Sequence, residues 1–340
     1  MRNILITGGA GVLGSSLAKA FLTLGNNVKI IDITRKEECW RLIESDIINK
    51  VDYIWKSTNE ISPLDIDGMD LIVDCAIGFP DRPFGTLSPK TTLSGNIFPA
   101  MGVLEAVRQL KEKPTIIYPS SFNALYGNSG IYDENTTPNP TTVYGWTKAA
   151  VEKLYLTYHH SFGIPIIITR VGSSYGEGMR TDELVARLIY AGIKRERFPL
   201  RSCQSVRLWT YIGDVVNAYS SIMKSSDYGR NNEFISRIKK RNYVINVAGN
   251  YGDEILTNVA LAKIVSNVTG FEDIIEPTSE YEPGELVNNT PVKFEINAQW
   301  SRDLIKWNPK YTLKEGIEST ANWFRKFLTE GAYLGHHERV

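Results

Sequence analysis

The sequence predicts an α/β protein in which a doubly wound parallel sheet is joined to a smaller C-terminal α/β lobe. In the first half of the chain, short apolar segments alternate with helical patterns, which is typical of parallel strands joined by crossover helices. At the N-terminus, a strand-like segment, a glycine-rich loop and an amphipathic helical pattern follow one another. After about residue 175, helical patterns dominate. We therefore expect a cofactor domain over residues 1–175 and a substrate lobe over 176–340, with some later segments returning to the first domain.

The expected strands are continuously apolar, because helices cover both faces of a parallel sheet. They lie at 3–7, 28–32, 70–76, 114–120 and 165–170. The helices expected between them lie at about 12–24, 96–111 and 143–161. In the second half we expect helices over 181–195 and 255–270, and a strand followed by a helix over 207–223.

The charge balance and the cysteine content exclude several classes of function. Lys plus Arg and Asp plus Glu number 38 each, so no basic field exists to attract nucleic acid or an anionic membrane. No segment approaches the roughly 20 apolar residues that span a bilayer. Three scattered cysteines do not suggest a disulfide framework or a metal site, and no secretory leader is recognisable. We expect a cytoplasmic protein without a metal.

The glycine-rich loop predicts a dinucleotide site and a Rossmann fold. It lies between a strand and a helix, where glycines make the turn, admit the pyrophosphate to backbone N–H groups and allow close packing. The loop residues expected at the cofactor are Gly8, Gly11, Val12, Leu13 and Gly14.

Asp32 favours NAD over NADP. It ends the second expected strand, 18 residues after Gly14, where a carboxylate accepts from the ribose hydroxyls and repels a 2′-phosphate. Arg35 is near enough to compensate such a phosphate, so NADP stays a second possibility. Without the glycine loop, Asp32 would be an ordinary solvated carboxylate at a strand end.

Tyr144 and Lys148 form the candidate catalytic pair. They are four residues apart at the start of an expected helix, and hence on one face. A neighbouring ammonium favours the phenolate and lowers the pKa of a tyrosine, so Tyr144 could take a proton from a hydroxyl. This spacing alone is common on helices and carries weight only together with the glycine loop.

The order and spacing of these motifs resemble the extended short-chain dehydrogenase/reductases, in the NAD-dependent epimerase/dehydratase family. The resemblance includes the glycine loop, Asp32, Asn96 and YxxxK at 144–148. It extends to RLWTYIGDVVNA at 207–218 and DLIKWNPKYTLKEGI at 303–317, and thus covers nearly the whole chain. It implies a Rossmann fold, NAD, a nucleotide-sugar substrate and a homodimer formed through paired helices.

The resemblance also implies roles for further residues. Ala76 and Ile77 would line the NAD cleft, and Asn96 would hold its helix and the cofactor near the nicotinamide. Arg207 matches the arginine that many members direct at the substrate diphosphate, a task for which the forked guanidinium is suited. A surface ion pair is the alternative interpretation of Arg207.

The third catalytic position departs from the family pattern. The family usually has Ser or Thr five residues before the glycine of its SSxxxYG segment, and here that position is Phe122. Ser121 is the nearest substitute. Asn123 could also hydrogen-bond a sugar oxygen, although both residues are equally compatible with an ordinary strand end.

The substrate loops also differ from the family pattern. The family's 4,6-dehydratases carry acidic residues where this chain has Asn123 and Ala124, which disfavours dehydration. In a late loop, Glu282 replaces an arginine that 4-epimerases often have, and a carboxylate there would repel a diphosphate. Either this loop points elsewhere, or the nucleotide is bound differently, with Arg201 or Arg207 as candidates. In the loop at 170–178, Ser173 stands where the family often has an asparagine shortly before a Tyr-Gly pair.

The leading hypothesis is an NAD-dependent nucleotide-sugar epimerase, an isomerase acting at C4 through a transient keto-sugar. Its catalytic residues would be Tyr144, Lys148 and Ser121, and its substrate-binding residues Asn123, Ser173 and Arg207. Alternatives are a keto-sugar reductase, a C2 epimerase, a dehydratase of the same family, and a catalytically silent NAD-binding regulator suggested by Phe122.

Overall fold

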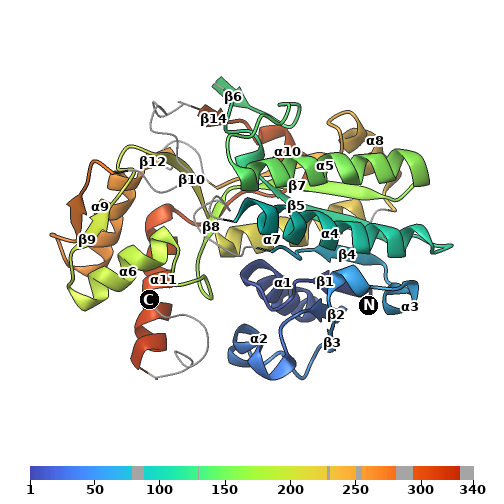
Figure 1. Cartoon of the computed structure of the whole chain (residues 1–340), viewed down its shortest axis with the longest axis horizontal. Helices are drawn as coiled ribbons and strands as arrows, with labels where there is room; N and C mark the ends of the chain where they lie inside the picture. The colour runs from blue at the N-terminus through green and yellow to red at the C-terminus, as the bar shows by residue number, and fades with distance from the viewer. Residues whose placement is uncertain (79–87, 129, 228–229, 250–254, 281–293, 330–340) are drawn as a thin grey trace.

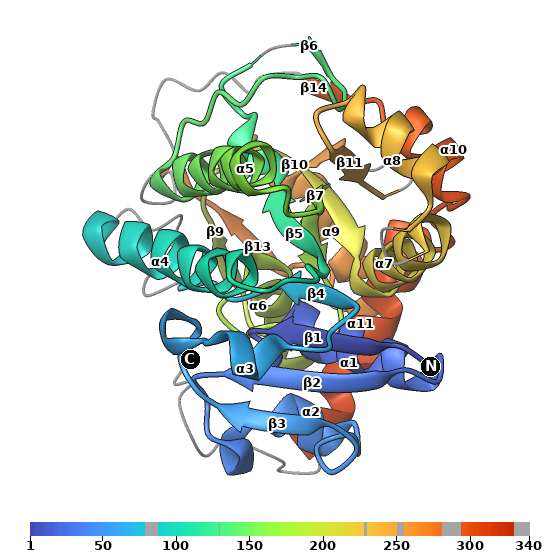
Figure 2. The ribbon, with the colours of Figure 1, turned by 90° about the vertical axis from the view of Figure 1, so that its right-hand side faces the viewer.

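The computed structural model describes residues 1–78, 88–128, 130–227, 230–249, 255–280 and 294–329. A seven-stranded parallel sheet lies at its centre, in the order β11-β7-β5-β4-β1-β2-β3 (Figure 2). Its strands are β1 (Asn3–Thr7), β2 (Asn27–Asp32), β3 (Asp52–Trp55), β4 (Leu71–Asp74), β5 (Thr115–Ser121), β7 (Ile166–Val171) and β11 (Val244–Val247).

Helices cover both faces of this sheet, which is why its central strands are apolar throughout. Ile4, Leu5 and Ile6 of β1 are all fully buried. Figure 2 shows α4 and α5 on one face of the sheet and α1 and α7 on the other. The helices around this sheet are α1 (Val12–Thr23), α2 (Trp40–Glu44), α3 (Pro63–Ile66), α4 (Pro89–Arg108), α5 (Val143–Phe162), α7 (Ile212–Ser226), α8 (Asn232–Lys239) and α10 (Gln299–Ile305). Short 3-10 turns are η1 (Lys36–Glu38), η2 (Thr58–Glu60) and η3 (Phe122–Ala124).

The strand order reverses between β1 and β4, since the chain runs outward through β2 and β3 before returning to the middle of the sheet. Ligands of open α/β sheets bind in the crevice outside the carboxyl ends of the strands at such a reversal. Thr7 and Asp74 end these two strands and pair in register. We therefore expect the crevice just beyond the carboxyl ends of β1 and β4.

A smaller lobe extends from the carboxyl side of the sheet (Figure 1). Its second hydrophobic core includes Val185, Leu188, Trp209 and Leu261. Its strands are β8 (Ser173–Tyr175), β9 (Phe198–Leu200), β10 (Val206–Tyr211), β12 (Ile255–Thr257) and β13 (Ile275–Pro277), and its helices are α6 (Leu184–Lys194), α9 (Asn258–Thr269) and α11 (Leu313–Thr329). A separate pair of strands joins β6 (Gly130–Tyr132) to β14 (Phe294–Ile296).

The last helix ties the small lobe to the large one. The ring of Trp323 on α11 stacks at 6.1 Å on that of Trp40 on α2, and its indole N–H donates to Glu44 Oε1 at 2.8 Å. Phe327 adds a third ring, 4.9 Å from Trp323. This aromatic contact fixes α11 of the small lobe against α2 of the large lobe.

The predicted α/β class and doubly wound sheet are confirmed, whereas several predicted boundaries were wrong. The helix expected from 96 begins at Pro89, a residue whose fixed φ suits the first helical turn. The sequence 255–270 contains the short strand β12 before α9. Strands β3 and β11 were missed, because β3 is a half-buried edge strand and β11 lies far along the chain within the second half. Among the helices that the structure describes, none is both long and apolar enough to cross a membrane.

Candidate active site

The glycine loop turns tightly between β1 and α1, and two of its positions can only be glycine. Gly8 has a φ of +65°, and a Cβ there would lie 2.7 Å from the carbonyl carbon of Cys75. A Cβ on Gly14 would lie 2.4 Å from the carbonyl oxygen of Gly8. The cradle is thus free of side-chain bulk and opens on the first turn of α1, which fits the pyrophosphate of a dinucleotide. Gly11, Val12 and Leu13 lie at the start of that turn.

Asp32 lies against this loop rather than in solvent. Its Oδ2 accepts from the backbone N–H of Ala10 at 2.9 Å, and its Oδ1 accepts from that of Thr34 at 2.8 Å. The side chain is buried. The carboxylate therefore joins the end of β2 to the glycine loop, and its contact with the adenosine ribose stays a prediction.

The segment after β4 is bound to α4 by Asn96. The amide of Asn96 donates to the carbonyls of Gly78 at 3.1 Å and Thr92 at 2.7 Å. Ile77 is exposed and Ala76 is half-buried. Both residues predicted to line the NAD cleft are therefore accessible. Asn96 thus fixes the helix to the segment beside the strand reversal, as a positioning residue would.

Helix α5 carries Tyr144 and Lys148. Thr142 caps this helix by accepting from the N–H of Gly145 at 3.0 Å. A Cβ on Gly145 would lie 2.4 Å from the carbonyl oxygen of Asn123, so the start of α5 packs tightly on η3. Lys148 Nζ lies 5.9 Å from the ring centre of Tyr144. The predicted pair is therefore adjacent, next to the segment that contains Asn123.

Lys148 is buried between polar and aromatic groups. Its Nζ donates to the carbonyl of Pro119 at 2.7 Å and lies 4.9 Å from the ring centre of Tyr118. Burial lowers the pKa of Lys148 to about 8, and the carboxylate of Asp74 is the strongest influence in the opposite direction. Lys148 is thus an ammonium whose charge depends on its surroundings.

Ser121 and Asn123 form a small polar cluster, while Phe122 points into the core. Ser121 Oγ accepts from the backbone N–H of Asn123 at 3.2 Å and from its Nδ2 at 3.0 Å. The hydroxyl proton of Ser121 stays available for donation. Asn123 Oδ1 is buried and has no hydrogen-bond partner within the described part of the chain. Phe122 is fully buried among Leu125 and Tyr132, so it cannot reach a substrate.

The structure brings Ser173 and Arg207 together through Tyr126, which sequence reasoning missed. Burial raises the pKa of the Tyr126 phenol, and the Arg207 guanidinium and a hydrogen bond with Ser173 oppose this rise. The signal was present, since Tyr126 is the tyrosine of the SSxxxYG segment. Arg201 instead pairs with Glu280 at 2.9 Å on the surface. Glu282 lies outside the described residues.

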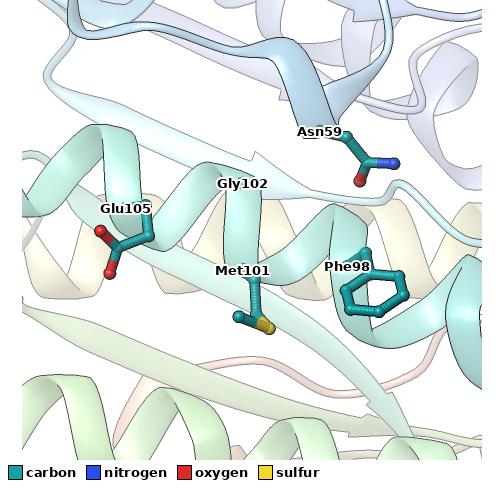
Figure 3. A pocket seen from close by; sticks show the side chains of 5 residues that line it. All are labelled: Asn59, Phe98, Met101, Gly102 and Glu105. Atoms are coloured by element: carbon teal, nitrogen blue, oxygen red, sulfur yellow. The ribbon is translucent and has the colours of Figure 1, made fainter.

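A shallow hollow lies elsewhere, where η2 packs against α4. It measures about 350 Å³ and is lined by Asn59, Phe98, Met101, Gly102 and Glu105. Figure 3 shows Asn59 of η2 near the α4 side chains. No predicted site residue lines this hollow, so we assign it no catalytic role. Within the described ranges, no three His, Cys, Asp or Glu side chains gather as metal ligands would.

Comparison with known proteins identifies the family. The model of the NAD dependent epimerase/dehydratase family matches residues 4–248. A dTDP-glucose 4,6-dehydratase of Xanthomonas campestris pv. campestris is 23% identical over 254 residues, covering 69% of this chain and 67% of that protein.

Solved structures of sugar-nucleotide enzymes share the fold. The UDP-glucuronic acid 4-epimerase of Bacillus cereus, solved with UDP-glucuronic acid and NAD, has a TM-score of 0.80 at 22% identity, covering 96% of this chain and 99% of that one. The UDP-glucose 4-epimerase of Thermotoga maritima has a TM-score of 0.78 at 20% identity, covering 96% and 99%. The chain therefore belongs to the NAD dependent epimerase/dehydratase family, a family of nucleotide-sugar enzymes, and its cofactor is NAD.

Proposed function

We propose that this protein is a nucleotide-sugar epimerase that inverts C4 of its sugar through a transient keto-sugar. The observation that carries the proposal is the Tyr144–Lys148 pair, which lies on α5 beside the carboxyl end of β5. A phenol next to an ammonium can serve as a base at neutral pH.

The residues would divide the chemistry as follows. NAD, when bound, supplies the hydride acceptor and donor. Tyr144 takes the proton of the sugar hydroxyl and returns it after the sugar has turned. Lys148 favours the phenolate form of Tyr144 by its positive charge, and Ser121 donates a hydrogen bond to the reacting sugar oxygen.

Three side chains would bind the substrate. The buried, unpartnered Oδ1 of Asn123 can accept from a sugar hydroxyl, which would remove the cost of leaving that oxygen unsatisfied. The guanidinium of Arg207 would bind the diphosphate, and Ser173, joined to it through Tyr126, would add a hydroxyl.

Epimerisation is favoured over dehydration by the composition of η3. A dehydratase of this family needs an acid after its Thr, whereas η3 consists of Phe122, Asn123 and Ala124. Both Phe122 and Ala124 are fully buried. This segment therefore offers no carboxyl group to protonate a leaving hydroxyl.

Tyr144→Phe tests the proposal. Loss of the base should lower kcat by about 10²- to 10⁴-fold while NAD stays bound. Tyr158→Phe is the matched control, because Tyr158 lies on the same helix with its hydroxyl on Glu105. Turnover should be followed by NMR with a panel of nucleotide sugars, and unchanged turnover in Tyr144→Phe would end the proposal.

The same assay distinguishes the alternatives. Steady consumption of added NADH with a keto-sugar would identify a reductase. Inversion at C2 rather than C4 would identify a C2 epimerase. A protein that retains NAD but turns over no nucleotide sugar would be the silent regulator that buried Phe122 suggests.

We further propose a homodimer formed through α4 and α5. These helices pack side by side (Figure 2), and the aromatic side chains of Phe98, Trp146 and Phe162 are exposed on them. Exposed aromatic residues of this size are typical of interfaces. Sedimentation should give a dimer that Phe98→Glu dissociates, and a monomeric wild type would contradict this.

We also propose that the protein works in the cytoplasm. All three cysteines, Cys39, Cys75 and Cys203, are free thiols, as is usual in a reducing compartment. Cell fractionation tests this, and recovery outside the cytoplasm would contradict it.

A further inference from the structure

Asp74 is a buried carboxylate in an otherwise apolar strand, and the proposed chemistry does not use it. Its Oδ1 accepts a hydrogen bond from the Thr7 hydroxyl, and its Oδ2 accepts from the Tyr155 hydroxyl at 2.5 Å. Both donors are neutral, so they satisfy the oxygens but do not compensate the charge. A buried carboxylate is costly unless an opposite charge lies near it. Burial raises the pKa of Asp74, so this carboxylate needs a nearby cation to stay ionised.

Lys148 is the cation that the fold supplies. The other carboxylate that acts on Lys148, that of Glu152, is already compensated, because Arg170 donates to it at 3.1 and 2.9 Å. Lys148 itself donates to the neutral carbonyl of Pro119. Asp74 has the strongest effect of any carboxylate on Lys148, and Lys148 is the cation that acts on Asp74. Stacked rings connect the two groups: Lys148 Nζ lies 4.9 Å from the ring centre of Tyr118, and Tyr118 stacks at 4.8 Å on Tyr155, which donates to Asp74.

A thiol and a phenol lie close to the pair. Burial raises the pKa values of the Cys75 thiol and the Tyr118 phenol, which keeps both neutral. The titratable and polar groups around the pair come from β1, β4, β5, α5 and α7, and they are Thr7, Cys75, Tyr118, Tyr144, Glu152, Tyr155 and Tyr219. Asp74 and Glu152 are the carboxylates that act on Lys148.

We propose that Asp74 is a positioning residue that keeps Lys148 in its ammonium form, acting from beneath the site without touching substrate or cofactor. The inference rests on the proposed function only in so far as Lys148 supports Tyr144. Asp74 ends β4 at the strand reversal, where Thr7 and Tyr155 hold its carboxylate in place. The Thr7 and Tyr155 hydroxyls would thereby orient the Asp74 carboxylate, whose charge acts on the site through Lys148.

Asp74→Asn tests the inference by removing the charge and keeping the shape. Tyr155 can then accept from the new amide, so the packing should survive. Burial already lowers the pKa of Lys148 to about 8, so losing the carboxylate should move its titration down by about one pH unit or more. NMR of protein containing ¹³C-labelled lysine measures this titration directly, with Lys148→Arg assigning the signal.

The kinetic readout is the alkaline side of the pH profile. Deprotonation of Lys148 removes support for Tyr144, so the fall of kcat/KM with rising pH should begin about one pH unit lower in Asp74→Asn. Asp70→Asn is the matched control, because Asp70 precedes the same strand and is paired with Arg230 at 2.6 Å. The control should leave both readouts unchanged.

A second variant keeps the test decisive if Asp74→Asn does not fold. Tyr155→Phe removes a hydrogen bond that lowers the pKa of Asp74, which weakens its charge and should shift Lys148 in the same direction by less. An unmoved Lys148 titration in a folded variant overturns the inference even if the wild type epimerises sugars. A moved titration in a wild type that turns over no sugar supports the inference and ends the proposed function.

Discussion

Helix α5, which carries the candidate catalytic pair, is braced by a buried ion pair whose loss should be costly. Arg170 of β7 donates to Glu152 of α5 through Nε at 3.1 Å and Nη2 at 2.9 Å, and both side chains are 3% exposed. Ser120 of β5 donates to the same carboxylate at 2.5 Å. Glu152→Gln keeps the shape but leaves the guanidinium buried without a counter-charge. Removing one partner of such a pair typically costs about 3–5 kcal/mol.

The chain contains an exposed pair of nearly identical geometry, which isolates the effect of burial. Arg180 donates to Asp182 through Nε at 3.0 Å and Nη2 at 2.9 Å, but the side chains are 39% and 45% exposed. Asp182→Asn should cost less than about 1 kcal/mol, because water solvates the freed charge.

Urea denaturation with saturating NAD, followed by tryptophan fluorescence, measures both changes. We expect Glu152→Gln to lower the free energy of unfolding by at least about 3 kcal/mol, and Asp182→Asn to leave it nearly unchanged. Equal losses from the two variants, or a loss below about 1 kcal/mol for Glu152→Gln, would refute the reasoning from burial.

Three further predictions concern the cofactor side and Lys148. Gly14→Ala places a Cβ 2.4 Å from the Gly8 carbonyl oxygen, so the protein should lose NAD on gel filtration. Full retention of NAD would contradict the proposal that the glycine loop binds its pyrophosphate. Asp32→Asn removes the charge that would repel a 2′-phosphate, so the preference for NAD over NADP should fall at least about tenfold in binding titrations; an unchanged ratio would exclude that role. Burial lowers the pKa of Lys148 from 10.5 to about 8, so between these pH values the unfolded chain holds a proton that the folded chain has lost. The free energy of unfolding should therefore rise with pH in that window, relative to Lys148→Met, by about 1.4 kcal/mol per pH unit; a flat difference would argue against burial of the amine.

The parts of the fold that sequence reasoning predicted have a strong local pattern. The strand, glycine loop and helix at the N-terminus lie where their apolar run and glycines require, and Asp32 ends β2 as expected. Buried strands such as β5 were recognisable because both of their faces are apolar. Strand β11 was missed, since it joins the large sheet from 73 residues beyond the end of β7 and only tertiary packing places it there.

The candidate site was predictable where a motif fixes spacing and not where distant segments meet. Tyr144 and Lys148 follow from a helical interval of four residues. The contact between Tyr126 and Ser173 joins the segment after η3 to β8, and the partners of Asp74 come from β1 and α5. An aspartate within an apolar strand was a visible signal, because a buried charge requires a partner, but the sequence does not say which one.

The most direct test of C4 epimerisation is NMR of the holoenzyme with a panel of nucleotide sugars in D₂O. The account predicts that C4 epimers interconvert, that the proton on C4 is retained without exchange for deuterium, and that no NADH accumulates. A keto-deoxy product carrying solvent deuterium on carbon, or epimers that never appear in any mixture, would contradict it.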